Sequence, residues 1–139
     1  MIIADAGPLV AILNADDKYH TACVDVLGRY PGPIIVPAPV VTEVAFLIQR
    51  DAGSEAEAQF LDSLVRRELI VEDLSIIDYQ RMAALVRQYA DFPLGSADAS
   101  VIAVAERLGV TRIATIDLRH FRAVRPAHCP AFELFPADA

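Results

Sequence analysis

Four acidic residues stand at similar positions in this 139-residue chain, each beside a segment with strand or helix character. Asp5 ends the apolar run "IIAD", and Asp117 ends "TRIATID". Glu43 lies in the first turns of the helical segment "PVVTEVAFLIQR", and Asp98 lies in the first turn of "ADASVIAVAERLG". Because ligand sites in open α/β sheets form beyond the carboxyl ends of the strands, we expect all four side chains to point into one crevice.

Each acid also has an ordinary structural explanation. Asp98 is favoured by the dipole of its helix, and Asp117 could begin a turn at "DLRHF". Asp5 could accept hydrogen bonds from the helix that follows it, and Glu43 could face solvent. The segment "VVTEVAFLI" is apolar nearly all round, which argues against a solvent-facing Glu43. Taken together, the four acids favour a shared site.

Clustered carboxylates need a counter charge. Two of them about 5 Å apart repel by roughly 3 kcal/mol at an effective dielectric of ~20, so the group must bind protons or a cation. Arg119 is the only lysine or arginine within three residues of any of the four. Oxygen ligands without His or Cys neighbours select a hard divalent ion. The sequence therefore predicts Mg²⁺ or Mn²⁺ bound by Asp5, Asp98 and Asp117, with Glu43 as an outer or additional ligand.

Carboxylates around a divalent ion suit phosphoryl chemistry, because the ion activates a water and stabilises charge on the phosphate during in-line displacement. We expect that water to attack phosphorus, so the ribose 2′-OH is not needed as nucleophile. The segment "RIATIDLRHFRAVRPAH" adds basic residues that could contact phosphates or stack on bases. The candidates are Arg112, Arg119, His120 and Arg122. A solvated basic tail explains any one of them about as well.

Motifs of other nucleotide-binding and hydrolytic proteins are missing. The chain has no GxxxxGK[ST] loop, no GxGxxG and no Ser/His/Asp layout of an esterase. His20 falls in a predicted surface helix, while His120 and His128 lie among arginines. These positions favour polar surface or phosphate contacts over a catalytic acid/base pair. A metal-free ribonuclease mechanism is therefore not expected.

The segments that must position these residues alternate between strands and helices. Strands are predicted at 2–5, 34–37, 69–74, 111–117 and 131–135, the last at an edge. Helices are predicted from Gly7–Pro8 onward and at 17–30, 39–53, 54–67, 75–90 and 97–109. Predicted N-caps are Ser54 (in a capping box with Glu57), Ser75 and Ser96. This order predicts an α/β fold, with a mainly parallel central sheet flanked by helices on both faces.

The composition bounds the remaining possibilities. The length predicts a single domain over residues 1–139, and the 55% hydrophobic content indicates that a second copy or a partner covers part of the surface. No apolar run reaches the ~18 residues of a membrane span. Cys23 and Cys129 lack ligand spacing, which fits a reducing cytoplasm. The net charge of −7 repels nucleic acid on average, but local charge decides at a binding surface.

The ordered set of motifs resembles the PIN-domain nucleases. The motifs are Asp5 after an initial apolar strand, "TEV" with Glu43, "DASVIAVAERLG" with Asp98 and "TIDLRHF" with Asp117, and the resemblance runs from residue 1 to about residue 126. Within that family, the chain is most similar to the VapC-type toxins of bacterial toxin–antitoxin pairs. The resemblance implies a metal-dependent endoribonuclease, usually a homodimer, which a small cognate VapB-type antitoxin neutralises.

The resemblance also assigns site residues. It implies an acidic metal shell made of Asp5, Glu43, Asp98 and Asp117. It places Thr115 where the family often keeps a hydroxyl near the site. The family usually has Ser or Thr directly after the first aspartate, whereas this chain has Ala6 and Gly7, so this loop offers no hydroxyl to water or substrate. Asp91, in "YADFPLG", also resembles a recurrent acid, and we expect it to structure its loop.

Two other functions are compatible with the same sequence. The fold could be a binding module whose acids hold the basic side chains of a partner, which the complete set of four acids argues against. It could also be an RNA- or DNA-processing nuclease without an antitoxin, although the short chain favours a stand-alone toxin. The sequence does not indicate which RNA is cut.

Overall fold

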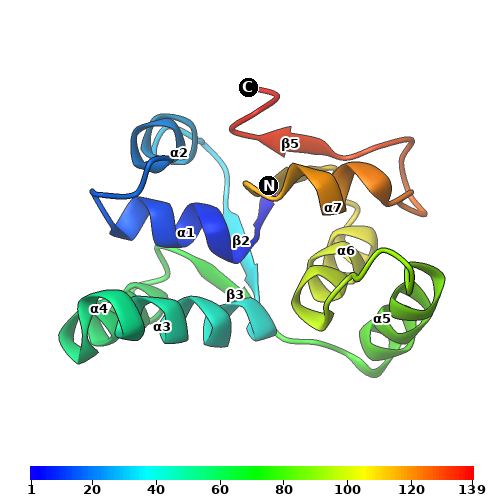
Figure 1. Ribbon diagram of the computed structural model, residues 1–139, viewed down its shortest axis with the longest axis horizontal. Coiled ribbons are helices and arrows are strands. Elements are labelled where there is room, and N and C mark those ends of the chain that lie inside the picture. Colours follow the sequence, from blue (N-terminus) through cyan, green and yellow to red (C-terminus); the bar gives the residue numbers. More distant parts are fainter.

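The computed structural model describes residues 1–139 and contains one five-stranded sheet in the order β3-β2-β1-β4-β5 (Figure 1). Its strands are β1 (Ile2–Ala4), β2 (Ile34–Pro37), β3 (Ile70–Glu72), β4 (Arg112–Ala114) and β5 (Glu133–Phe135), and all pairings are parallel. The helices are α1 (Ala6–Leu13), α2 (His20–Leu27), α3 (Ala38–Ala52), α4 (Ser54–Val65), α5 (Ile76–Gln88), α6 (Ser96–Leu108) and α7 (Leu118–Ala123). The predicted parallel α/β fold is confirmed, with β5 at an edge. None of these helices has the length and apolar character needed to cross a bilayer.

The order of the strands reverses at β1. β2 and β3 follow on one side of it, and β4 and β5 lie on the other side. The carboxyl ends of β1 and β4 therefore meet in the middle of the sheet, at the kind of switch point where ligand sites form. The amide of Asp5 donates to the carbonyl of Ala114 at 2.9 Å, which carries the pairing one residue beyond the end of β1. The residues that follow β1 and β4 are thus held side by side.

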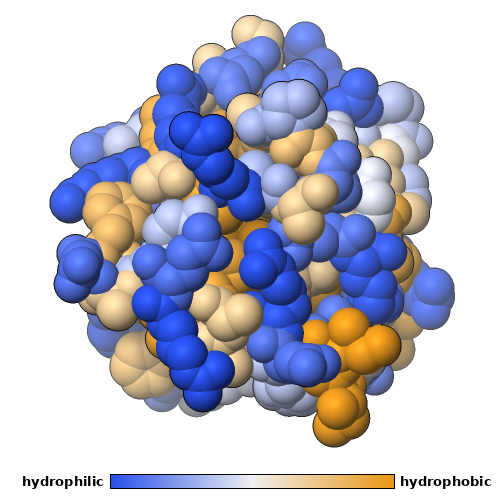
Figure 2. All heavy atoms as spheres, turned by 90° about the vertical axis from the view of Figure 1, so that its right-hand side faces the viewer, coloured by the Kyte–Doolittle hydropathy of each residue, from blue (hydrophilic) through white to orange (hydrophobic).

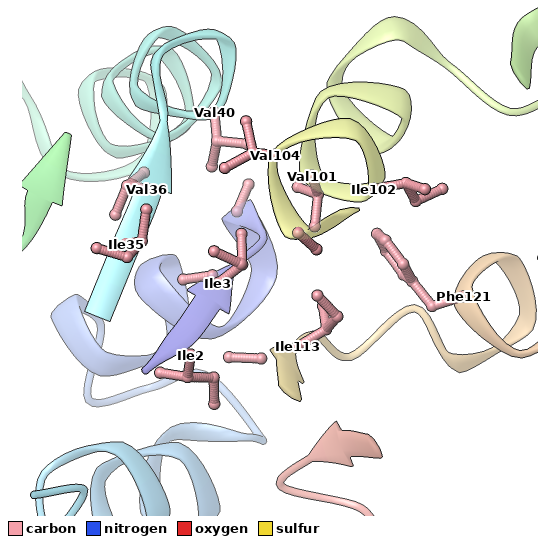
Figure 3. Packing of buried hydrophobic residues seen from close by; sticks show 14 of the residues in the cluster. Ile2, Ile3, Ile35, Val36, Val40, Val101, Ile102, Val104, Ile113 and Phe121 are labelled. Carbon is pink, nitrogen blue, oxygen red and sulfur yellow. The ribbon is translucent and has the colours of Figure 1, made fainter. Parts of the chain in front are cut away.

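The central strand lies in the middle of the hydrophobic core. Residues Ile2–Ala4 are fully buried, as expected for a parallel strand covered on both faces. In Figure 3, Phe121 of α7 lies between Ile102 of α6 and Ile113 of β4. This packing fixes α6 and α7, and with them the acids at their amino-terminal ends, against the centre of the sheet. Figure 1 shows α1 to α4 on one side of the molecule and α5 to α7 with β5 on the other.

Of the three predicted N-cap residues, one caps its helix in the structure and two do not. Ser75 caps α5 in a capping box, because its hydroxyl accepts from the Asp78 amide at 3.2 Å and its own amide donates to Oδ2 of Asp78 at 2.9 Å. The predicted caps at Ser54 and Ser96 are wrong. Each of these serines is the first residue inside its helix, follows a glycine, and makes no capping hydrogen bond. Gly53, at φ 89°, makes the turn between α3 and α4 and shifts the start of α4 by one residue.

The segment after β4 differs most from the prediction. The strand predicted over 111–117 ends at Ala114, and the unpredicted helix α7 begins at Leu118. Asp117 is the N-cap of α7, where its Oδ1 accepts from the His120 amide at 3.3 Å. Six residues are too few to show a helical period, so the pattern of apolar residues gave no signal for α7. The helix predicted over 17–30 is also shorter in the structure, at His20–Leu27.

Candidate metal centre

Thr115 joins the two aspartates that follow β1 and β4. Its hydroxyl donates to Oδ2 of Asp5 at 3.0 Å and accepts from the amide of Asp117 at 3.0 Å. The amide of Thr115 donates to the carbonyl of Phe135 at 2.9 Å, so its backbone is fixed as well. The side chain is 0% exposed, which leaves no face for a substrate. The prediction that Thr115 contacts the substrate is therefore corrected: this hydroxyl holds Asp5 beside Asp117.

Gly7 allows α1 to approach the turn after β4. A Cβ atom at Gly7 would lie 2.5 Å from Cγ1 of Ile116, closer than carbon atoms can approach. A larger residue at position 7 would therefore have to displace the side chain of Ile116, which directly precedes Asp117. Ala6, which stands where the family usually has a hydroxyl residue, is 4% exposed and apolar.

Asp98, Asp117 and His120 bring one ligand atom each to within 4.8 Å of one another. Nδ1 of His120 lies 2.9 Å from Oδ2 of Asp98 and 2.7 Å from Oδ2 of Asp117. This nitrogen is buried, and it makes no hydrogen bond of acceptable geometry with either oxygen. Its position between two carboxylates fits a cation shared by all three side chains.

The argument from the sequence assumed that no histidine lies beside the acids, and the position of His120 corrects this assumption. His120 was predicted instead as a candidate contact to RNA. Residues three apart on a helix face the same side, so α7 brings His120 back to its own N-cap, Asp117. Phe92, in the loop before α6, meets the His120 ring edge-on, with 5.1 Å between the ring centroids and 86° between the planes. Reading "DLRHF" as a helix begun by its own aspartate would have revealed this arrangement.

Glu43 lies outside the close group that Asp98, Asp117 and His120 form. It is the sixth residue of α3, more than one turn from the amino-terminal end, and it is exposed. The expectation that its apolar surroundings would keep it from solvent is wrong, because the neighbouring Phe46 is also exposed, at 62%. Partial burial of the carboxylate and the charge of Asp5 raise the pKa of Glu43. This acid is therefore electrostatically linked to Asp5 but does not join the close group around His120.

The environment of the site disfavours the ionised forms of Asp5 and Asp98. Burial raises the pKa of Asp5, which is 8% exposed, although the Ala6 amide and the Thr115 hydroxyl act in the opposite direction. Burial and then the charge of Asp5 raise the pKa of Asp98 to about 6, again against the effect of His120. At neutral pH these partly buried carboxylates repel one another, and a bound divalent cation would reduce the repulsion. The donor set fits such an ion.

The arginines predicted to contact RNA lie in different places. Arg112 begins β4, at the opposite end of the strand from the acids, and donates to the Tyr30 hydroxyl at 3.3 Å. The strand separates Arg112 from the acids, so a contact between Arg112 and a substrate stays a prediction. Arg119 is exposed in the first turn of α7, with its guanidinium 4.8 Å from the centre of the Phe92 ring. Arg122 pairs with Asp138 at 3.0 Å.

Known proteins share both the sequence pattern and the fold. The chain is 28% identical over 135 residues to Ribonuclease VapC26 of Mycobacterium tuberculosis, covering 97% of this chain and 100% of that protein. Its structure is similar to that of VapC20 from Mycobacterium tuberculosis, a toxin that cleaves the sarcin-ricin loop, with a TM-score of 0.76, 18% identity and coverage of 81% of this chain and 87% of that one.

Two further solved structures share the fold. VapBC2 from Rickettsia felis, bound to a DNA fragment from its promoter, matches with a TM-score of 0.72 and 16% identity over 97% of this chain and 99% of that one. FitAcB from Neisseria gonorrhoeae matches with a TM-score of 0.62 and 17% identity over 85% and 88% of the two chains. The family model described as PIN domain matches residues 2–125, a range that contains every acid of the site. This chain belongs to the PIN-domain family.

Proposed function

We propose that this chain is a divalent-metal-dependent endoribonuclease and the toxin of a VapBC-type toxin–antitoxin pair. The observation that carries the proposal is the meeting of Asp98, Asp117 and His120 at one point, with Asp5 held beside them by Thr115. The relatives named above support RNA as the substrate, since one is a ribonuclease and another cleaves the sarcin-ricin loop. We place this activity in the cytoplasm, where such RNA is found.

In this proposal Asp5, Asp98 and Asp117 hold Mg²⁺ or Mn²⁺, and Glu43 contributes negative charge from outside the close group. When bound, the ion supplies positive charge that offsets the charge of the phosphate and lowers the pKa of a water. Thr115 prevents the Asp5 carboxylate from turning away, and burial keeps water from competing for that carboxylate. These residues hold the acids in place before the ion and the RNA arrive.

Arg119 is the phosphate contact that this geometry favours. It is exposed, it lies two residues beyond Asp117, and the Phe92 ring supports its guanidinium from one side. Contacts to phosphate position an RNA strand without reading its sequence. Arg122 lies on the same helix, but its pairing with Asp138 leaves less net positive charge. We therefore expect Arg119→Gln to weaken RNA binding more than Arg122→Gln does. The affinity of Arg119→Gln for RNA should also depend less on salt concentration than that of the wild type, because one phosphate contact is lost.

The experiment that tests the proposal compares the wild-type protein with Asp5→Asn and Asp98→Asn on structured RNA. We expect cleavage by the wild type in Mg²⁺ or Mn²⁺, none in EDTA, and none by either variant, with unchanged circular dichroism spectra. Full activity in EDTA or in both variants would overturn the metal-dependent mechanism. A chain that binds RNA but never cleaves it would instead be a binding module.

The proposed partner is a small antitoxin. The structural neighbours include VapBC2 and FitAcB, whose names describe complexes with a second component. We expect a short open reading frame immediately upstream of this gene, and we expect its product to co-purify with the chain and to stop RNA cleavage at equimolar concentration. A neighbouring product that neither binds nor inhibits would contradict this part of the proposal and leave the nuclease activity untouched.

A homodimer is the proposed assembly. Ile76 and Ile77, at the start of α5, are 83% and 71% exposed, which is unusual for two adjacent large apolar side chains. Figure 2 shows the face of the molecule that carries α5 and α7, where a strongly hydrophobic patch interrupts a mainly hydrophilic surface. Light scattering at micromolar concentration should give the mass of two chains, and Ile77→Asp should give the mass of one. A monomeric wild type would contradict the assembly.

A further inference from the structure

The close group of side chains at this site is not made of oxygen atoms alone. Nδ1 of His120 lies 2.7 Å and 2.9 Å from carboxylate oxygens of Asp117 and Asp98, and it is buried without a hydrogen-bond partner. Two constraints hold the ring in this place. The first turn of α7 begins at the Asp117 cap, and Phe92 meets the ring edge-on. The nitrogen is thus positioned as firmly as the acids are.

We propose that Nδ1 of His120 is a ligand of the ion, and that this nitrogen makes the site select Mn²⁺ over Mg²⁺. The inference rests on the proposed function, since it requires that the acids bind a divalent ion. Carboxylate, carbonyl and water oxygens suit both ions, but Mn²⁺ is a first-row transition ion and accepts an imidazole nitrogen more readily than the harder Mg²⁺ does. Replacing one oxygen ligand by nitrogen therefore weakens Mg²⁺ binding relative to Mn²⁺ binding.

A second arrangement of the same atoms makes the opposite prediction. A protonated His120 would act as a built-in counter-ion for Asp98 and Asp117, and it would compete with the metal for their oxygens. Removing the imidazole would then strengthen metal binding, because the acids would lose the positive charge that lies between them. The direction of the change in affinity separates a ligand from a competitor.

The first measurement is calorimetric titration of Mn²⁺ and of Mg²⁺ into the metal-free full-length chain. His120→Asn keeps a polar group of similar reach and removes the imidazole nitrogen. We expect it to weaken Mn²⁺ binding by about tenfold or more, the range found when groups that orient metal ligands are lost, and to weaken Mg²⁺ binding less. His20→Asn is the matched control, because His20 lies in the first turn of α2, where its Nδ1 contacts the Ala11 carbonyl at 2.7 Å.

The second measurement is pulsed electron paramagnetic resonance of the Mn²⁺ complex, which detects a nitrogen bonded to the ion. We expect a ¹⁴N modulation in the wild type that changes frequency in protein labelled with ¹⁵N-histidine. His120→Asn should remove the modulation and His20→Asn should keep it. Bound Mn²⁺ without nitrogen modulation, or tighter Mn²⁺ binding by His120→Asn, would overturn this inference alone. Failure of the wild type to bind either ion would instead overturn the proposed function.

Discussion

Thr115 and Asp5 lie 110 positions apart in the sequence, and the hydroxyl of one donates to the carboxylate of the other at 3.0 Å. The contact exists because β1 and β4 are neighbours in the sheet and the pairing continues through the Asp5 amide to the Ala114 carbonyl. The same hydroxyl accepts from the amide of Asp117. The geometry of the metal centre is therefore a property of the pairing between two strands that are distant in sequence.

Removing the Thr115 hydroxyl should leave Asp5 less firmly positioned without creating a cavity in the core. Thr115→Val keeps the shape of the side chain, but leaves the Asp117 amide and the Asp5 carboxylate without a shared partner. We expect a loss of about tenfold or more in metal affinity and of about 1–2 kcal/mol in the free energy of unfolding. Thr115→Ser, which restores the hydroxyl, is the control. Equal metal binding by Thr115→Val and the wild type would show that Asp5 is held by other means.

Asp98→Asn should make the metal-free protein more stable while it abolishes cleavage. The raised pKa of Asp98, about 6, means that ionising this carboxylate at neutral pH opposes folding. A neutral amide of the same shape removes that penalty, by about 1–3 kcal/mol. Urea unfolding at pH 7 in EDTA measures the gain. A destabilised variant would contradict the inference that the ionised Asp98 carboxylate opposes folding.

The stability of the metal-free protein should depend on pH through the same carboxylate. Because the folded-state pKa of Asp98 is raised from 3.8 to about 6, the stabilisation provided by its protonated form is complete below pH 3.8 and is lost as the pH rises through about 6. The difference in free energy of unfolding between Asp98→Asn and the wild type should therefore be near zero at pH 4 and grow toward pH 7. Taking the difference cancels the contributions of titrating groups that do not interact with Asp98.

Added metal should reverse this dependence. A divalent ion binds the ionised carboxylates, so the rise in melting temperature caused by Mn²⁺ should increase between pH 5 and pH 7. Scanning calorimetry with and without Mn²⁺ across this range makes the comparison. A metal-induced rise that does not change with pH would mean that the ion binds elsewhere.

At the carboxyl-terminal end of α6, far from Asp98, Arg107 forms ion pairs with Asp78 and Glu72. Nε of Arg107 lies 3.0 Å from Oδ1 of Asp78, which is 2% exposed, and Nη1 of Arg107 lies 2.9 Å from Oε1 of Glu72. Burial acts to raise the pKa of Asp78, but the hydrogen bonds from Arg107 and Ser75 outweigh it and hold this pKa below its usual value. The pair therefore contributes stability that is lost only as the pH falls through that lowered pKa.

Arg107→Met should leave the Asp78 carboxylate buried without its cation. We expect the free energy of unfolding to fall by about 2–3 kcal/mol at pH 7, less than the ~3–5 kcal/mol typical of a fully buried pair, because the Arg107 side chain is 31% exposed. Arg50→Met is the matched control, because Arg50 and Asp51 form a solvent-exposed pair whose loss should change nothing measurable. Urea unfolding of both variants makes the comparison, and equal effects would contradict it.

The parts of the fold that could be predicted were those with continuous apolar runs or clear helix boundaries. "IIA" and "IIVP" had to be buried strands, and Gly109 ends α6 in the left-handed conformation, at φ 68°. Parallel strands joined by helices then place Asp5 and Asp117 at the same edge of the sheet. The alternation of strands and helices in the sequence predicts this topology, and the topology brings the two acids close together.

The parts that could not be predicted depend on local geometry. α7 is too short to show a period, so the return of His120 to Asp117 had no signal in the apolar pattern. The exposure of Glu43 depends on which side of α3 meets α1 and α6, and a helix that is apolar nearly all round does not reveal this. Arg112 was assigned by proximity in sequence to Asp117, although the strand between them places it at the opposite end of the sheet.

The strand order has a consequence for how such a chain is made. Asp5 is synthesised before Asp117 and His120, which follow only after β2, β3, β4 and six helices have been synthesised. Until β4 inserts beside β1, no nascent chain brings these side chains together. A chain interrupted before β4 therefore has Asp5 and Asp98 but lacks the residues that complete the candidate metal centre.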